Sequence, residues 1–191
     1  MIELKNVSIS FDEKVIINNL SLSLPDTGLV TISGSSGSGK TTLLRALLGL
    51  QKYSGEIKTV RKITSSAVFQ ESNLLPWLTA VENVTAVSEI NGENIEKAKN
   101  LLKQVGFNET DFDKLPSELS VGMARRVAAA RAVMIDADVL ILDEPFAGLD
   151  ENNISAVADL LLSKRDEKLI ILVTHVGDFS ADFDYKIGNN D

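Results

Sequence analysis

The stretch GSSGSGKT, residues 34–41, constrains this chain more than any other feature of its sequence. It fits the pattern G-x-x-x-x-G-K-[ST], in which glycines let successive backbone N–H groups converge on phosphate oxygens. The apolar run at 29–32 predicts a buried strand before it, and residues 42–48 predict a helix after it. A strand, a glycine-rich loop and a helix N-terminus are the setting that this pattern requires. The sequence therefore predicts a nucleotide site here.

Within this site we expect Lys40 to reach the β- and γ-phosphates and the Thr41 hydroxyl to hold Mg²⁺. A Gly/Ser-rich surface turn before a lysine is the alternative, but it would not explain a strand and a helix in register with the pattern. The residues expected to contact the nucleotide in this segment are Gly34, Ser35, Ser36, Gly37, Ser38, Gly39, Lys40, Thr41 and Thr42.

A second apolar strand, predicted over residues 138–142, ends in two carboxylates and a proline, Asp143-Glu144-Pro145. Buried parallel strands deliver side chains from their carboxyl ends to the crevice where ligands bind. We expect Asp143 to support Mg²⁺ and Glu144 to face the γ-phosphate, where a carboxylate can orient or deprotonate the attacking water. An ordinary acidic turn is the alternative, and the phosphate loop earlier in the chain makes it less favoured.

Two aromatic residues have positions that leave their roles open. His175 follows a predicted buried strand at 169–174 and is the only histidine. A lone histidine is usually structural, but one at this strand end could also hydrogen-bond a γ-phosphate. Phe11 could stack on adenine or fill the core, and the pattern alone favours the core.

Composition narrows the class of protein. The chain has 191 residues, of which 44% are hydrophobic, and no cysteine. It carries 27 acidic against 19 basic residues, a net charge of −8, which disfavours a nucleic acid partner. No apolar run approaches the roughly 20 residues of a membrane span, and the N-terminus lacks a signal-peptide pattern. We therefore expect one cytoplasmic domain over residues 1–191.

The remaining patterns predict local structure. Alternating apolar residues over 2–24, with one slip, indicate antiparallel strands, and 55–60 and 63–69 indicate two more. Thr79 to Glu82 forms a capping-box pattern that opens a helix, which we expect Asn91-Gly92 to break. Further helices are expected over 93–105 and over 124–135, the latter capped by Ser120.

In this order the motifs resemble the nucleotide-binding domain of ABC ATPases, and the resemblance runs from residue 2 to about 187. It rests on six segments: 34–41 (Walker A), Gln70 (Q-loop), 119–123 (signature), 139–145 (Walker B and the following glutamate), 148–150 (D-loop) and His175 (H-loop). The resemblance implies an α/β P-loop NTPase fold with a RecA-like core, an antiparallel β subdomain and an inserted α-helical subdomain at about 71–135. It also implies ATP hydrolysis between two such domains packed head to tail.

The resemblance also implies roles for individual residues. Phe11 takes the place that stacks on adenine, and Gln70 links Mg²⁺ and water to the helical subdomain. Ser120 and Gly122 contact the γ-phosphate of ATP bound to the opposite subunit. Asp150 bridges the two subunits, and His175 holds the γ-phosphate and the water.

The signature departs from the usual Leu-Ser-Gly-Gly-Gln, because this chain has Val121 and Met123 in it. Val121 adds a branched side chain where backbone N–H groups approach phosphate. Met123 cannot hydrogen-bond as glutamine would. Since Ser120 and Gly122 remain, we expect hydrolysis at a reduced rate or with a demanding partner requirement.

The apolar loop LLPWL, residues 74–78, bears on the choice of partner. The segment 74–84 resembles ATPases of nitrate, sulfonate and taurine importers, which implies that Gln70 to Val84 dock a transmembrane permease and that the chain lies on the inner face of the membrane. Burial of Trp77 under the helical subdomain is the alternative. Only 16 residues follow His175, so we expect no C-terminal regulatory domain.

Two other classes stay open on the sequence alone. A small-molecule P-loop kinase fits the length and the phosphate loop, but not the signature or the strand that ends at His175. A non-transport ABC ATPase would usually carry tandem domains or long helical insertions. The identity of the second ATPase domain, whether an identical copy or a different chain, is also open.

Overall fold

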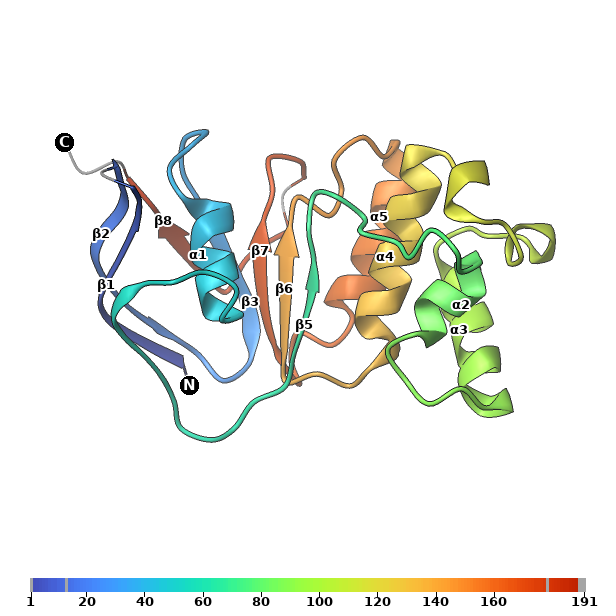
Figure 1. Ribbon diagram of the computed structural model, residues 1–191, viewed down its shortest axis with the longest axis horizontal. Helices are drawn as coiled ribbons and strands as arrows, with labels where there is room; N and C mark the ends of the chain where they lie inside the picture. Colours follow the sequence, from blue (N-terminus) through green and yellow to red (C-terminus); the bar gives the residue numbers. More distant parts are fainter. Residues whose placement is uncertain (1, 13, 178, 189–191) are drawn as a thin grey trace. The chain divides into compact units, whose positions relative to one another are not determined.

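The computed structural model describes residues 2–12, 14–177 and 179–188. Contacts divide the chain into two compact units (Figure 1). The first contains Met1–Ser65, Asp138–Asp143 and Arg165–Asp191, and the second contains Ser66–Ala137 and Glu144–Lys164. Among the described residues no helix combines the length and the apolar character that crossing a bilayer would require.

The first unit contains an antiparallel sheet with the strand order β2-β1-β4. Its strands are β1 (Ile2–Phe11), β2 (Lys14–Leu24) and β4 (Ser54–Thr59). The register of β1 shifts between Leu4 and Val7, where Asn6 has a φ of 50°. A bulge of this kind adds a residue to one strand and re-aims the following side chains. It explains the slip in the alternation of β1 and keeps Leu4 and Val7 both buried.

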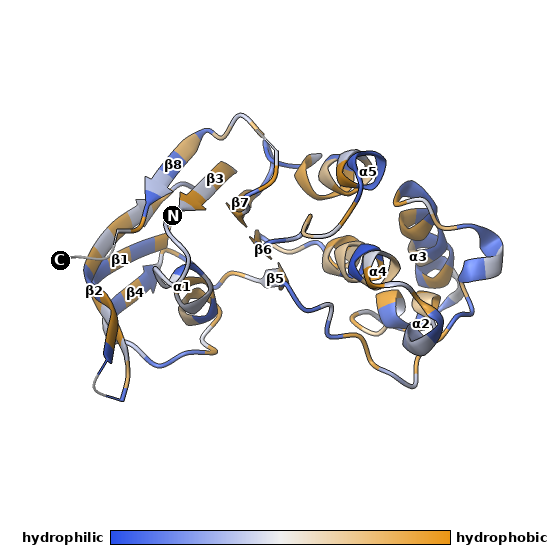
Figure 2. Cartoon of the chain, turned by 90° about the horizontal axis from the view of Figure 1, so that it is seen from above, coloured by the Kyte–Doolittle hydropathy of each residue, from blue (hydrophilic) through white to orange (hydrophobic). Residues whose placement is uncertain are grey.

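The same unit contains a parallel sheet in which β6, β7, β3 and β8 lie in that order (Figure 2). These strands are β6 (Val139–Asp143), β7 (Leu169–Val173), β3 (Gly28–Ser33) and β8 (Phe183–Lys186). Every residue of β6 and β7 is buried. A strand covered on both faces reads as a continuous apolar run, which is why both were visible in the sequence. The helix α1 (Lys40–Leu47) follows β3. The strand β5 (Ser65–Val68) begins at Ser65, the last residue of the unit's first segment.

The second unit is mainly helical. It contains α2 (Ala80–Thr85), α3 (Gly92–Gln104), α4 (Val121–Met134) and α5 (Glu151–Leu162), with 3₁₀ turns at Glu109–Asp111 and Pro116–Glu118. The helix α4 packs against α2, α3 and α5. Small side chains allow this close packing, since α4 buries four alanines along its length.

The predicted end of one helix is wrong. The helix that opens at the Thr79 capping box ends at Thr85, not at Asn91. The hydroxyl of its last residue, Thr85, donates back to the carbonyls of Val81 and Glu82. Such bonds compete with a continuing helix. Asn91 instead caps α3 by accepting from the N–H of Asn94 at 2.8 Å.

Candidate nucleotide site

The phosphate loop connects β3 to α1 in the first unit. Gly39 stands at the N-cap of α1 with a φ of 95°, and no side chain caps this helix. The first turn of α1 also lacks an acidic residue. Unpaired N–H groups and the positive end of the helix dipole therefore remain available to an anion.

Lys40 is held against the loop. Its Nζ donates to the carbonyl oxygens of Gly34 and Ser35, both at 2.9 Å, and the residue is 9% exposed. Gly34 has a φ of 155°, and a Cβ there would lie 2.5 Å from the carbonyl oxygen of Ile187 and 2.7 Å from Ser38 Oγ. Only glycine fits this position, because any side chain would collide with backbone. The loop is thus a close-fitting cradle around an ammonium group.

Ser38 provides an independent sign of a ligand. Its hydroxyl is buried and has no hydrogen-bond partner within the described part of the chain. Leaving a buried polar group unpaired costs about 1–3 kcal/mol. A ligand oxygen held by the loop would supply the missing partner. Sequence reasoning listed Ser38 only as one loop residue, and its burial could not be read from the pattern.

The strand register brings two further predicted residues to the same edge of the parallel sheet. Asp143 ends β6 opposite Val173 of β7, and β7 in turn runs parallel to β3, whose carboxyl end leads into the phosphate loop. His175 lies two residues beyond the end of β7 and is exposed. Asp143 is 3% exposed, and no cation pairs with it among the described residues. A buried carboxylate without a cation is costly, so this edge favours a bound metal ion.

The second unit holds the signature residues and the segment after Asp143. Ser120 caps α4 by accepting from the N–H of Met123 at 3.1 Å. A Cβ on Gly122 would lie 3.4 Å from Leu149 Cδ2, so the start of α4 packs closely on the D-loop segment. Asp150 caps α5, and hydrogen bonds from the backbone and side chain of Asn153 lower the pKa of its carboxyl.

Two arginines of α4 were not predicted as part of this arrangement. The Arg125 guanidinium donates to the carbonyl of Ala147, which fixes the D-loop segment to α4. Arg126 donates to the carbonyl of Val105 at 2.7 Å, and burial lowers the pKa of its guanidinium. The two arginines are neighbours in the sequence and follow the signature closely. The carbonyls that they bind are 21 or more residues away, so no local pattern predicts these hydrogen bonds.

Three other predicted residues have distinctive exposure or backbone geometry. Glu144 has a φ of 51°, uncommon for a non-glycine residue and often found at functional sites. Gln70 is exposed two residues after β5. Phe11 is 48% exposed at the end of β1, so the expectation that it fills the core is wrong. Its ring is available to stack on a ligand.

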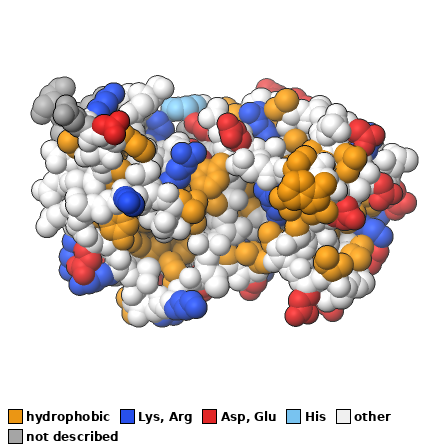
Figure 3. Space-filling model, in the orientation of Figure 1, with side chains coloured by type: hydrophobic (Ala, Val, Ile, Leu, Met, Phe, Trp, Pro, Cys, Tyr) orange, Lys and Arg blue, Asp and Glu red, His pale blue; other side chains and the backbone are white. Residues whose placement is uncertain are grey.

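Trp77 is 70% exposed, which agrees with the expected apolar surface loop and excludes the alternative in which this side chain is buried. In the second unit, hydrophobic side chains gather on one face (Figure 3), and Val87 and Ile90 are also exposed. Contiguous exposed apolar surface marks interaction sites more often than isolated residues do. Trp77 is one of the exposed apolar side chains of this unit, which makes its loop a candidate docking segment.

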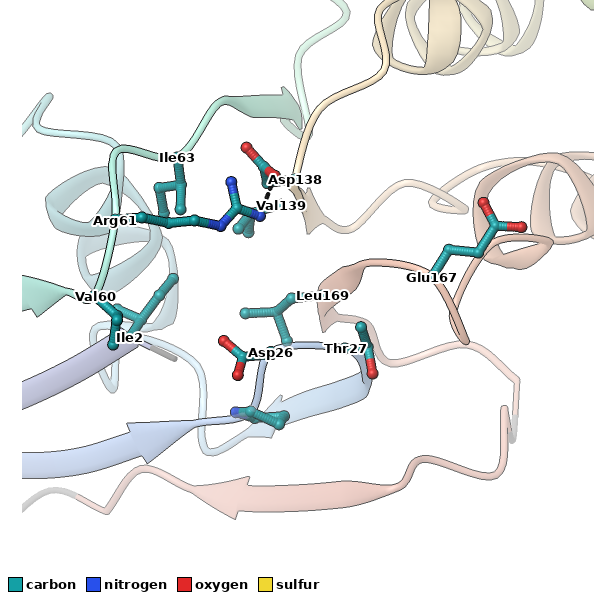
Figure 4. A pocket seen from close by; sticks show the side chains of 11 residues that line it. Ile2, Asp26, Thr27, Val60, Arg61, Ile63, Asp138, Val139, Glu167 and Leu169 are labelled. Atoms are coloured by element: carbon teal, nitrogen blue, oxygen red, sulfur yellow. Dashed lines mark hydrogen bonds and ion pairs between the residues drawn. The ribbon is translucent and has the colours of Figure 1, made fainter.

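A separate cavity of about 320 Å³ lies at the amino-terminal end of the parallel strands, where β6 and β7 begin (Figure 4). Arg61 and Asp138 form an ion pair at 2.6 Å in its wall. Hydrogen bonds from the N–H of Thr64 and the side chains of Arg61 and Thr64 lower the pKa of Asp138 to about 2. This cavity contains none of the residues predicted to bind nucleotide.

A glycine-rich phosphate loop between a parallel strand and a helix defines a P-loop NTPase. A model of the ABC transporter family matches residues 17–147, and this chain belongs to that family. It is an ATP-binding and ATP-hydrolysing subunit that powers transport by an ABC transporter. The assignment excludes the small-molecule kinase.

Relatives and solved structures agree with this assignment. An aliphatic sulfonates import ATP-binding protein of Paracoccus denitrificans is 35% identical over 91% of this chain and 72% of its own length. An uncharacterized ABC transporter ATP-binding protein of Haemophilus influenzae is 36% identical over 92% of this chain and 75% of its own length. A dimeric ATP-binding cassette in a post-hydrolysis state, bound to ADP and Pi, has a TM-score of 0.82 at 30% identity and covers 92% of this chain and 88% of that one.

Proposed function

We propose that this chain hydrolyses Mg·ATP as one of a pair of ATPase domains that drive an importer. The observation that carries the proposal is the cradle formed by the glycine loop and Lys40, on the same sheet edge as the buried carboxylate of Asp143. In it, Gly34 to Thr42 hold the triphosphate and Phe11 stacks on adenine. Glu144 acts as the base, and His175 and Gln70 orient the water and the γ-phosphate.

Thr41, Gln70 and Asp143 would hold Mg²⁺. The buried carboxylate of Asp143, which has no cation beside it within the described ranges, supports this assignment. The described residues contain no cluster of three acidic, histidine or cysteine side chains that could hold a metal ion without the nucleotide. Mg²⁺ is usually held by one or two carboxylates together with substrate phosphates, so one carboxylate suffices. When bound, the ion would neutralise charge on the phosphates.

The second half of the site comes from a partner domain. We assign Ser120 and Gly122 to the γ-phosphate of ATP on the partner, and Asp150 to the contact between domains. The dimeric cassettes among the similar structures support a pair, and the chain's own sequence does not distinguish an identical partner from a different one. Val121, 69% exposed at the start of α4, places a branched side chain on this surface, which supports a reduced rate.

The membrane partner is assigned to residues Gln70 to Val84. The exposure of Trp77 supports docking of a transmembrane permease there, with the chain peripheral on the inner face of the membrane. The sulfonate import relatives favour import over export. Co-purification of a polytopic membrane protein with this chain tests the assignment, and recovery with a DNA-processing complex instead would overturn it.

The base assignment is tested with Glu144→Gln. Loss of the carboxylate should lower ATP turnover by at least about 100-fold, the usual contribution of a positioned base, while ATP is still bound. The trapped ATP should shift the chain to a dimer in gel filtration. Glu151→Gln, an exposed glutamate in the first turn of α5, is the matched control and should hydrolyse ATP like the parent. Parental turnover in Glu144→Gln would show that the base lies elsewhere.

A further inference from the structure

The loop that carries Trp77 is anchored by one buried amide. Asn83, on α2, is completely buried, and its Oδ1 accepts from the N–H of Leu75 at 2.8 Å. Its Nδ2 donates to the carbonyls of Leu75 at 3.1 Å, Leu78 at 2.8 Å and Thr79 at 3.1 Å. The polar atoms at both ends of this amide are therefore satisfied by loop backbone. A loop of apolar residues becomes a defined surface instead of a flexible one, because its backbone has fixed partners.

A cation from α4 holds the other end of the same loop. Arg131 donates from Nη2 to the carbonyl of Ser72 at 2.9 Å and from Nη1 to that of Asn73 at 3.0 Å. No carboxylate is paired with Arg131 in the part of the chain that the structure describes, and burial lowers the pKa of its guanidinium. A partly buried cation compensated only by carbonyls is a costly way to fix a loop. Its two-pronged geometry, however, joins two consecutive peptide groups to one helix.

The helix that carries Arg131 is the helix that begins at the signature. Arg131 lies 11 residues after Ser120, the N-cap of α4, which corresponds to about 16 Å along a helix. The helix α4 also packs against α2, which carries Asn83. A displacement of the loop therefore has a short, continuous route to Ser120, through two hydrogen bonds and one helix.

We propose that Arg131 and Asn83 are positioning residues that make the loop Ser72–Thr79 and the helix α4 move as one body, so that a change at Ser120 is reported at Trp77. This rests on the proposed function, in which Ser120 meets nucleotide and Trp77 meets the permease. It adds the residues that connect the two.

Trp77 is the only tryptophan in the chain, so its fluorescence reports on this loop alone. In a Glu144→Gln background, where trapped ATP pairs two domains and brings Ser120 to the partner's nucleotide, we expect Mg·ATP to shift the Trp77 emission. Adding Arg131→Met, which removes the donors but keeps an apolar side chain, should abolish that shift. Arg131→Lys should restore part of it, because one donor can still reach a carbonyl. Asn83→Ala should increase iodide quenching of Trp77 even without nucleotide.

Lys97→Met is the matched control. Lys97 Nζ donates to the carbonyl of Met134 at 2.8 Å, so it is also a cation bound to a carbonyl in the second unit, but it does not touch the loop. This variant should keep the shift. Circular dichroism and retention of nucleotide in gel filtration show that each variant is folded and binds Mg·ATP.

An unchanged shift after Arg131→Met, or no shift in a Glu144→Gln protein that retains Mg·ATP as a dimer, overturns the proposal. Failure of the proposed function looks different, because it appears as absent nucleotide retention or as a missing membrane partner. All measurements use the full chain without a permease, so the two failures remain distinguishable.

Discussion

Gly34→Ala is the sharpest test of the cradle. The new Cβ would lie 2.5 Å from the carbonyl oxygen of Ile187 and 2.7 Å from Ser38 Oγ, and the φ of 155° is strained for any L residue. The backbone strain costs about 1–3 kcal/mol. Displacing a close neighbour costs about 1–3 kcal/mol more, since backbone cannot rotate away as a side chain can. The free energy of unfolding should therefore fall by about 2–6 kcal/mol.

Gly49→Ala is the matched control, because Gly49 has a positive φ of 71° but open space around its Cβ position. Its free energy of unfolding should fall only by the cost of placing a non-glycine residue in the left-handed region, about 1–2 kcal/mol. Both variants gain equally from a less flexible unfolded chain, so that contribution cancels. A difference of about 2 kcal/mol between them corresponds to about 4–8 °C in Tm for a chain of this size.

The assay is thermal unfolding without nucleotide, followed by ATP binding. Gly34→Ala should melt well below Gly49→Ala and bind ATP at least about tenfold more weakly, a loss of about 1.4 kcal/mol. Gly49→Ala should bind ATP like the parent. Equal melting temperatures for the two variants would refute the argument that the cradle leaves no room for a side chain.

The other predictions concern the signature and the cavity ion pair. Replacing Val121 by Gly and Met123 by Gln together should raise ATP turnover, because backbone N–H groups then approach phosphate without a branched side chain; unchanged turnover would contradict the reduced-rate hypothesis. Folding lowers the pKa of Asp138 to about 2, so the folded state favours the charged carboxylate. The charged carboxylate therefore stabilises the folded protein above about pH 4, and this contribution is lost as the pH falls toward 2. Asp138→Asn should thus have a lower Tm than the parent at pH 6, and the difference should shrink between pH 4 and pH 2. A difference that stays constant over this range would exclude ionisation of Asp138 as its cause.

Elements buried on both faces were predictable because their whole length is apolar. The strands β6 and β7 appear in the sequence as uninterrupted aliphatic runs, and the structure buries every residue of each. The end of α2 was not predictable, because it depends on the Thr85 hydroxyl bonding back to carbonyls of its own helix. Threonine can form such a bond or leave it unformed, and the sequence does not distinguish these cases.

The exposure of Phe11 was not predictable from the alternating pattern of its strand. A pattern of alternating residues gave Phe11 a place in the core, but it lies at the end of β1, where the sheet no longer covers it. The exposure of Trp77 was expected, but the hydrogen bonds between Asn83 and the backbone of its loop are not visible in any local pattern. In both cases the outcome depends on which segments lie nearby, and a linear pattern does not contain that information.

By itself, the sequence determined the phosphate loop, the carboxylates at a strand end and the order of motifs that marks the family. These depend on backbone conformations and on chemistry that only a few residues permit over short spacings. The tertiary structure alone decided that Ser38 keeps an unpaired buried hydroxyl, that Arg131 reaches carbonyls 58 and 59 residues away, and that Asn83 anchors the exposed loop. Such contacts join segments whose spacing along the chain is arbitrary, so only the packing of helices and strands brings them together.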